Sequence, residues 1–188
     1  MHADASLIRP EHPGDLEAIR RLHLSAFRDH GRVVNALVGD LRPTIAELGG
    51  SSFVAAAAGE IQGHVMVTMS LLDTARRLLP APVLSPLAVA PEHQGAGLGA
   101  SLVQHALRSA SEADWPFVIL EGDPGYYARL GFRPAGGLGF RRPSLRIPDA
   151  AFQVVLLPAY EPWMTGTLVY AWPFWAHDAV GLRTDASA

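Results

Sequence analysis

A run of glycines between an apolar strand and a helix is the part of the sequence best suited to chemistry. Leu87–Ala90 is apolar, Pro91 ends it, and Gln94-Gly95-Ala96-Gly97-Leu98-Gly99 leads into a segment with helical spacing. Glycines let the backbone approach a ligand closely, and the free N–H groups of a helix's first turn attract anions. The segment therefore predicts an anion cradle suited to a pyrophosphate. A tight turn with glycines for packing is the alternative.

Two other kinds of phosphate site fit this segment poorly. A dinucleotide fingerprint requires G-x-G-x-x-G, whereas this chain has G-x-G-x-G after Gln94, so a nucleotide or dinucleotide enzyme is disfavoured. A P-loop requires lysine, and all 15 basic residues here are Arg. The chain also has no Cys, which excludes disulfides, thiol nucleophiles and zinc-thiolate sites. Without Lys, Schiff-base chemistry is excluded too.

A second informative segment follows the helix. Phe117–Glu121 is a short apolar run, and the Gly/Asp/Pro turn at Gly122–Gly125 ends it. Tyr126–Leu130 then predicts a short helix, with Gly131 as its C-cap. The two segments enclose a strand–helix–strand unit.

Both segments resemble motifs of the GNAT superfamily of N-acetyltransferases. Gln94–Gly99 matches the Q/R-x-x-G-x-G/A signature that binds the acyl-CoA pyrophosphate in that family. Tyr126–Phe132 resembles the family's Y-Y-x-R-x-G-F segment, and the two lie in the family's order. The tail Gly166–Tyr170, with the later Pro173-Phe174, is similar to the YhbS-like branch.

The resemblance implies an α/β GNAT fold with a central mixed sheet and helices on both faces. The fourth and fifth strands of this fold splay apart to admit the pantetheine arm of acetyl-CoA, and Pro86 in the fourth strand agrees because proline removes a ladder donor. Acetyl-CoA is the implied co-substrate. Its implied binding residues are Leu87, Ala88, Val89, Gln94, Gly95, Ala96, Gly97, Leu98, Gly99, Ala100 and Tyr126.

The reaction that the resemblance implies is direct attack by an amine on the thioester. Tyr127, four residues before Gly131, aligns with the general acid that protonates the leaving thiolate. Tyr126 is its neighbour or substitute, and core packing is the alternative for both. Glu121 is a candidate general base that acts through a water. The branch usually has a small or apolar residue there, and we prefer a solvated strand end.

The histidines give weaker signals. We interpret His64 as a core histidine rather than a base, and His93 as a solvated residue on the rim of the cradle. No pair of His or carboxylate residues has the spacing of metal ligands, so no metal is predicted.

Length and composition indicate one domain with a packed core. The chain has 188 residues, of which 49% are hydrophobic and 18% charged, so we expect a single domain over 1–188 with its core at about residues 7–175. The net charge of −3 argues against a nucleic-acid partner. No apolar run reaches the ~18 residues of a membrane helix, and Met1–Pro10 lacks the pattern of a signal peptide. We therefore expect a cytoplasmic protein without membrane contact.

Hydrophobic spacing predicts the remaining elements. Helices are expected from Asp15 to Phe27 and over Val33–Leu41, with Pro43 as the end of the second. The predicted strands are Leu7–Pro10, Phe53–Ala57, Ile61–Leu71, Val83–Val89, Phe117–Glu121, Phe152–Leu157 and Thr167–Tyr170. Pro80 and Pro82 are expected to break the chain before the fourth of these.

An aromatic run lies near the C-terminus: Trp163, Tyr170, Trp172, Phe174 and Trp175. Packing of the last strands or a homodimer face is the interpretation we prefer, and a pocket for an apolar or cationic amine is the alternative. The sequence as a whole predicts an acetyl-CoA-dependent N-acetyltransferase that acts on a primary amine of a small molecule or peptide. A non-catalytic acyl-CoA-binding regulatory or structural module of the same fold is the alternative.

Overall fold

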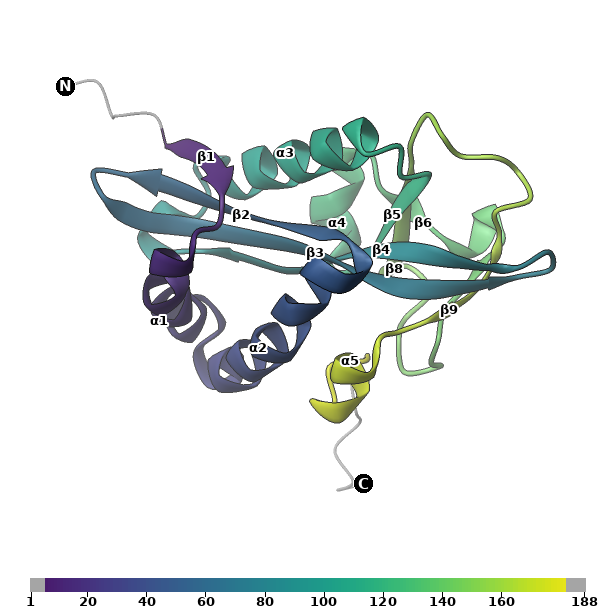
Figure 1. Ribbon diagram of the computed structural model, residues 1–188, viewed down its shortest axis with the longest axis horizontal. Coiled ribbons are helices and arrows are strands. Elements are labelled where there is room, and N and C mark those ends of the chain that lie inside the picture. Colours follow the sequence, from purple (N-terminus) through teal and green to yellow (C-terminus); the bar gives the residue numbers. More distant parts are fainter. Residues whose placement is uncertain (1–5, 182–188) are drawn as a thin grey trace. The chain divides into compact units, whose positions relative to one another are not determined.

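The structure is a computed structural model that describes residues 6–181, and its chain divides into two compact units. Unit 1 contains residues up to Thr68 and residues Leu84–Ala113, and unit 2 contains Met69–Val83 and the residues from Asp114 onward. The elements, labelled in Figure 1, are β1 (Leu7–Pro10), α1 (Leu16–Phe27), α2 (Gly31–Leu48), β2 (Gly50–Ala57), β3 (Glu60–Thr74), β4 (Leu78–Val89), α3 (Leu98–Glu112), β5 (Phe117–Glu121), α4 (Pro124–Tyr127), β6 (Arg133–Pro134), β7 (Phe140–Arg141), β8 (Phe152–Leu156), β9 (Gly166–Val169) and α5 (Trp172–Ala176). Because β3 and β4 are long, each contributes to both units.

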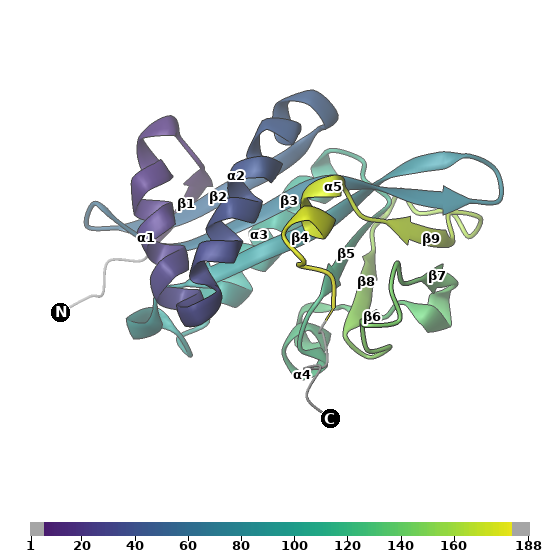
Figure 2. The ribbon, with the colours of Figure 1, turned by 90° about the horizontal axis from the view of Figure 1, so that it is seen from below.

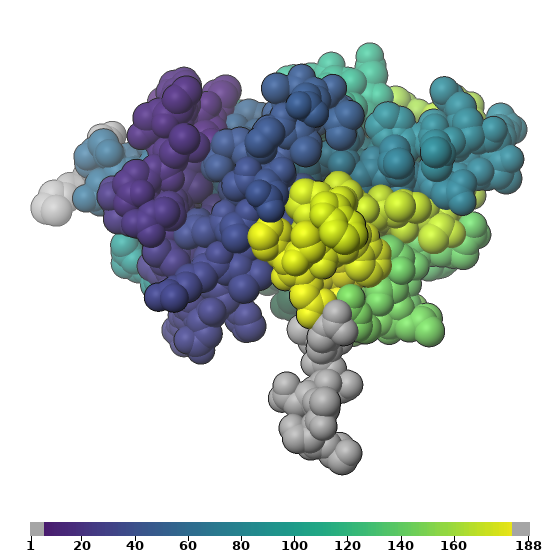
Figure 3. Space-filling model, turned by 60° about the horizontal axis from the view of Figure 1, so that its bottom comes forward, coloured from purple at the N-terminus to yellow at the C-terminus, as the bar shows by residue number. Residues whose placement is uncertain are grey.

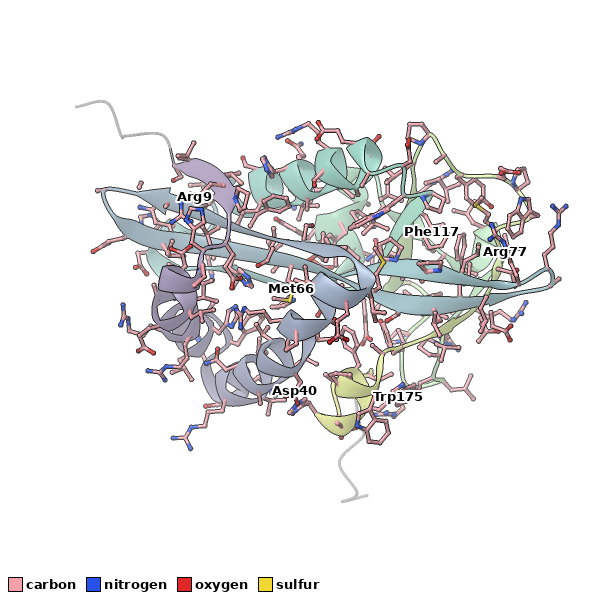
Figure 4. The ribbon with its side chains drawn as sticks, viewed as in Figure 1. Arg9, Asp40, Met66, Arg77, Phe117 and Trp175 are labelled. Atoms are coloured by element: carbon pink, nitrogen blue, oxygen red, sulfur yellow. The ribbon has the colours of Figure 1, made fainter. Side chains whose placement is uncertain are left out.

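Unit 1 is a sheet with helices on both faces. Its strands follow the order β1-β2-β3-β4, with β1 and β2 paired antiparallel from Leu7↔Ala56 to Pro10↔Phe53. Helices α1 and α2 cover one face and α3 the other (Figures 1 and 2). Met66 lies in the core between the sheet and α2 (Figure 4), and Gly63 allows α3 to approach, since a β-carbon there would be 2.7 Å from Leu102 Cδ1.

Unit 2 is built around β5 and β8. These strands pair antiparallel over five residues, and β5 joins β4 in parallel at Val83↔Ile119. The second half of β3 pairs with β9, which in turn pairs in parallel with β7. The core is aromatic, and the rings of Phe117 (Figure 4) and Phe140 meet edge to face at 5.2 Å.

The predicted α/β fold with a mixed sheet is confirmed, and most predicted strands lie within one or two residues of their observed bounds. Short β6 and β7 and helix α5 were not predicted. The predicted splay of the fourth and fifth strands concerns parts of the chain in different units and stays a prediction.

Two proline predictions are wrong. Helix α2 continues through Pro43 to Leu48. Pro43 and the residue four before it, Gly39, are both exposed, so the carbonyl that loses its partner can be hydrated. Strand β4 begins at Leu78 and includes Pro80 and Pro82. Residues two apart on a strand direct their N–H groups to the same edge, so both missing donors fall on one edge, where proline is tolerated.

Candidate active site

The glycine-rich segment of unit 1 forms an exposed turn between β4 and α3. A short 3-10 turn, Pro91–His93, follows the strand. Gly95 has φ +77° and Gly97, the N-cap of α3, has φ +89°. A β-carbon at either glycine would meet nothing within 4 Å, so the left-handed backbone, rather than crowding, requires glycine there.

The start of α3 leaves backbone donors free for a ligand. Its N-cap makes no side-chain hydrogen bond and its first turn carries no acidic residue. The first helical bond is donated by Ser101 N–H to Gly97 O at 3.0 Å, so the amides of Leu98, Gly99 and Ala100 have no acceptor within the helix. These amides and the helix dipole make the turn electropositive.

The Gln94 side chain fixes this turn to the end of β4. Gln94 Nε2 donates to Val89 O at 2.9 Å. Along the same strand, Leu87 and Val89 are half-buried, whereas Ala88 is buried. A cavity of about 620 Å³ lies beside the turn and is lined by Ser6, Ile8, Ala57, Ala58, Gln62, His93, Ala96, Gly97, Leu98 and Ser101. His93 is therefore half-buried at this cavity rather than fully solvated.

In unit 2, the end of β5 leads directly into α4. Glu121 is the last residue of the strand, opposite Phe152. The Asp123 side chain caps α4 by accepting from Gly125 N–H at 3.0 Å. The ring of Tyr127 then lies against Gly122, where a β-carbon would be 2.4 Å from its Cε2. Gly122 thus connects the two predicted catalytic residues, because it follows Glu121 on the chain and contacts the ring of Tyr127.

Tyr127 keeps its proton at any ordinary pH. Burial of the ring raises the pKa of its phenol, and the neighbouring Tyr126 raises it further. The two tyrosine rings meet edge to face at 4.9 Å, and the Arg129 guanidinium lies 6.0 Å from the Tyr126 ring. Among the described residues, no group accepts a hydrogen bond from the Tyr127 hydroxyl. The hydroxyl proton of Tyr127 can therefore be donated to a ligand without breaking a hydrogen bond to another described residue.

Glu121 is half-buried, not the solvated strand end that we preferred from the sequence. Burial raises the pKa of its carboxyl, while a hydrogen bond from Gly181 N–H and the charge of Arg146 oppose that rise. The N–H of Gly181 lies 3.2 Å from Glu121 Oε2. A carboxylate with a raised proton affinity is a better base than an exposed one.

A buried polar network in unit 1 was not predicted. His64 is 0% exposed, which agrees with its interpretation as a core histidine, and its Nδ1 lies 3.0 Å from His23 Nε2. His23 Nδ1 lies 3.0 Å from Asn35 Oδ1. At the other end, Ser52 and His64 contact Glu11, whose Oε1 accepts from Arg42 Nε at 2.6 Å. Residues 11 to 64 are too far apart in the sequence for spacing to reveal this arrangement.

The described part of the chain holds no group of three or more His, Asp or Glu residues arranged for a metal ion. Within residues 6–181, no helix has both the length and the apolar character needed to cross a membrane.

Comparison with known proteins decides the family. The model of the acetyltransferase (GNAT) domain matches residues 7–135, more than half of the chain. The chain belongs to the GNAT acetyltransferase family. The prediction made from Gln94–Gly99 and Tyr126–Phe132 is therefore confirmed.

The relatives of this GNAT protein include two from Escherichia coli K12. It is 32% identical to the uncharacterized N-acetyltransferase YjhQ, over 85% of this chain and 88% of YjhQ. It is 33% identical to the uncharacterized N-acetyltransferase YhbS, over 79% of this chain and 85% of YhbS. The predicted YhbS-like branch is thus supported by sequence.

Solved GNAT structures agree with the fold. The crystal structure of E. coli YhbS in complex with CoA matches with a TM-score of 0.78 and 30% identity, covering 93% of this chain and 94% of that one. A GNAT acetyltransferase from Brucella melitensis in complex with acetyl-CoA matches with a TM-score of 0.68 and 27% identity, covering 90% and 97%.

Proposed function

We propose that this GNAT protein is an acetyl-CoA-dependent N-acetyltransferase that transfers an acetyl group to a primary amine. The observation that carries the proposal is the start of α3, where Gly95 and Gly97 adopt a left-handed backbone and the amides of the first turn have no acceptor within the helix. That arrangement suits a pyrophosphate. The CoA and acetyl-CoA bound to the YhbS and Brucella relatives support coenzyme A as the ligand.

The residues of each unit have distinct roles in this proposal. In unit 1, Leu87–Val89 and the amides of Gln94–Ala100 would hold acetyl-CoA, whose thioester supplies the acetyl group. In unit 2, Glu121 accepts a proton from the attacking amine, because an amine must be neutral to act as a nucleophile. Tyr127 donates its phenolic proton to the leaving thiolate. Burial raises the pKa of this phenol, so the proton is present at neutral pH.

Two measurements test this proposal. Isothermal titration with CoA reports binding, and release of free CoA thiol in the presence of acetyl-CoA reports transfer to a panel of primary amines. The proposal expects both, with amide formation confirmed by mass spectrometry of the acceptor. Binding of CoA without transfer to any amine, peptide N-termini included, would favour the non-catalytic acyl-CoA-binding module instead.

A further inference from the structure

The segment after α5 is fastened to the core of unit 2. Phe174 is buried and stacks on Tyr170 with ring centroids 4.6 Å apart. Ala179 N–H donates to Phe174 O at 2.8 Å, and Val180 is 0% exposed. In Figure 3, α5 and the described residues that follow it lie in the yellow part of the molecule. Residues 178–181 therefore follow a defined path rather than a free tail.

This path ends at the carboxylate of Glu121. Gly181 N–H donates to Glu121 Oε2 at 3.2 Å, and Arg146 Nη1 donates to Asp178 Oδ1 at 3.1 Å. Gly181 has φ +64°, and a β-carbon there would be 2.6 Å from the carbonyl carbon of Arg146. Only glycine brings the backbone this close to Arg146 while presenting its N–H to the carboxylate.

Three separate segments of the chain supply the groups that surround Glu121. Arg146, in the loop before β8, and Gly181, after α5, both favour the ionised carboxylate. Tyr170, after β9, is buried and its phenol stays neutral, since burial and the charge of Glu121 both raise its pKa. Asp178 holds Arg146 at this site. Burial raises the pKa of the Glu121 carboxyl, while the hydrogen bond from Gly181 and the charge of Arg146 oppose that rise, so these three effects together set the strength of the base.

We propose that Asp178–Gly181 is a positioning segment for Glu121: the Gly181 amide fixes Oε2, and Arg146, tethered by Asp178, stabilises the carboxylate. Oε1, which accepts no hydrogen bond from the described residues, is left to take the proton of the amine. The inference rests on the proposed function. It adds that residues far from β5 in the sequence set the strength of the base.

The first test replaces Gly181. In Gly181→Ala the new β-carbon displaces the segment. The hydrogen bond from the backbone N–H of residue 181 to Glu121 Oε2 is then lost, and the pKa of the Glu121 carboxyl rises. We expect the acidic limb of the kcat/KM profile to move up by about 0.5–1 pH unit. The matched control is Gly136→Ala in the same unit, where a β-carbon meets nothing within 4 Å, and its profile should coincide with wild type. A uniform loss of activity with an unmoved limb would overturn the proposal.

A second variant covers the case in which Gly181→Ala unfolds. Arg146→Met should shift the limb in the same direction, and Arg146→Lys should restore it largely, because it keeps the charge. A limb that stays in place in Arg146→Met would contradict the proposal.

Carboxyl titration separates this inference from the proposed function. The Glu121 resonance, followed by carbon-detected NMR and assigned by its absence in Glu121→Gln, should titrate at higher pH in Gly181→Ala than in wild type. That shift is expected even if no amine is acetylated, in which case the proposed function fails and the positioning role stands. If the protein acetylates amines but Glu121 titrates at the same pH in Gly181→Ala and in wild type, the positioning role is wrong and the proposed function stands.

Discussion

The aromatic ring of Tyr127 lies against the α-carbon of Gly122, so closely that a β-carbon there would be 2.4 Å from Cε2. Gly122 directly follows Glu121 on the chain, and its own N–H donates to Ala151 O at 3.0 Å. The contact sets the phenol of α4 against the end of β5. It makes Gly122 a residue that couples the two candidate proton-transfer groups.

Gly122→Ala should therefore lower turnover without affecting CoA binding. The added methyl group must displace the Tyr127 ring, and a misplaced catalytic group costs rate rather than cofactor affinity. We expect kcat to fall at least ~10-fold, on the order of a modest misplacement, with the CoA Kd unchanged by calorimetry. Gly137→Ala, where a β-carbon meets nothing within 4 Å, is the control. Wild-type kcat in Gly122→Ala would show that the ring position is irrelevant.

Tyr127→Phe tests the acid directly. It keeps the ring packed on Gly122 and removes the proton, so kcat should fall ~10²-fold, the low end for acid catalysis, with CoA binding nearly unchanged. Tyr126→Phe, on the adjacent ring, is the variant that tests the alternative acid. A larger loss in Tyr126→Phe than in Tyr127→Phe would reverse the assignment of the two tyrosines.

Glu121→Gln should lower the acetyltransferase activity and raise the Tm of the protein. The folded protein raises the pKa of Glu121, so the unfolded chain ionises it more easily. Its contribution to the free energy of unfolding is full below pH 4.5 and is lost as pH rises through the raised pKa. At pH 7 the Gln variant should have a higher Tm and a kcat/KM profile without its acidic limb. A lower Tm at pH 7 would mean that Glu121 stabilises the fold.

The sequence predicts the glycine-rich turn before α3 and the short helix α4 because both depend on local pattern: the glycine spacing, a strand before each segment and a helix within or after it. It could not predict the environment of Glu121. That environment is created by Gly181 and Arg146, which are far away along the chain and have no distinctive spacing. Likewise, local propensity predicts a helix end at Pro43, whereas the exposure of Gly39 and Pro43 lets α2 continue.

The His23–His64 pair should make unit 1 labile to mild acid. Burial, together with the adjacent His64, lowers the pKa of His23 to about 4, and burial also lowers the pKa of His64, so both rings are neutral in the fold at pH 7. Stability from His23 is complete above pH 6.5 and is lost as pH falls toward 4.

The free energy of unfolding should thus fall by up to about 1.4 kcal/mol per pH unit for each proton taken up in that range. His23→Gln should flatten this slope in chemical denaturation, and the exposed His30→Gln should not. Equal slopes in the two variants would contradict a buried neutral His23.

We also propose that the exposed apolar side chains of unit 2 form a homodimer face. Leu71 and Val169 are register partners on β3 and β9, at 43% and 44% exposed, and Trp172 is 75% exposed. Trp175 lies on the same short helix as Trp172 (Figure 4). Such a patch tends to be covered.

Light scattering should therefore show a particle of about twice 20.1 kDa, which Trp172→Glu converts to a monomer. Leu48→Glu, at an exposed apolar position of unit 1, is the control. A particle of 20.1 kDa at all concentrations would rule out the dimer.

The affinity of Gly97 variants for CoA tests the central claim most directly. Gly97→Asn and Gly97→Asp have side chains of the same size and share the cost of φ +89°, so they differ in charge alone. If the start of α3 holds the pyrophosphate, calorimetry should show a CoA Kd for the Asp variant at least ~10-fold weaker than for the Asn variant, because the carboxylate opposes the phosphates. The difference should shrink as salt is raised. Equal Kd values for the two variants, both within a factor of two of wild type, would show that the cradle does not bind CoA.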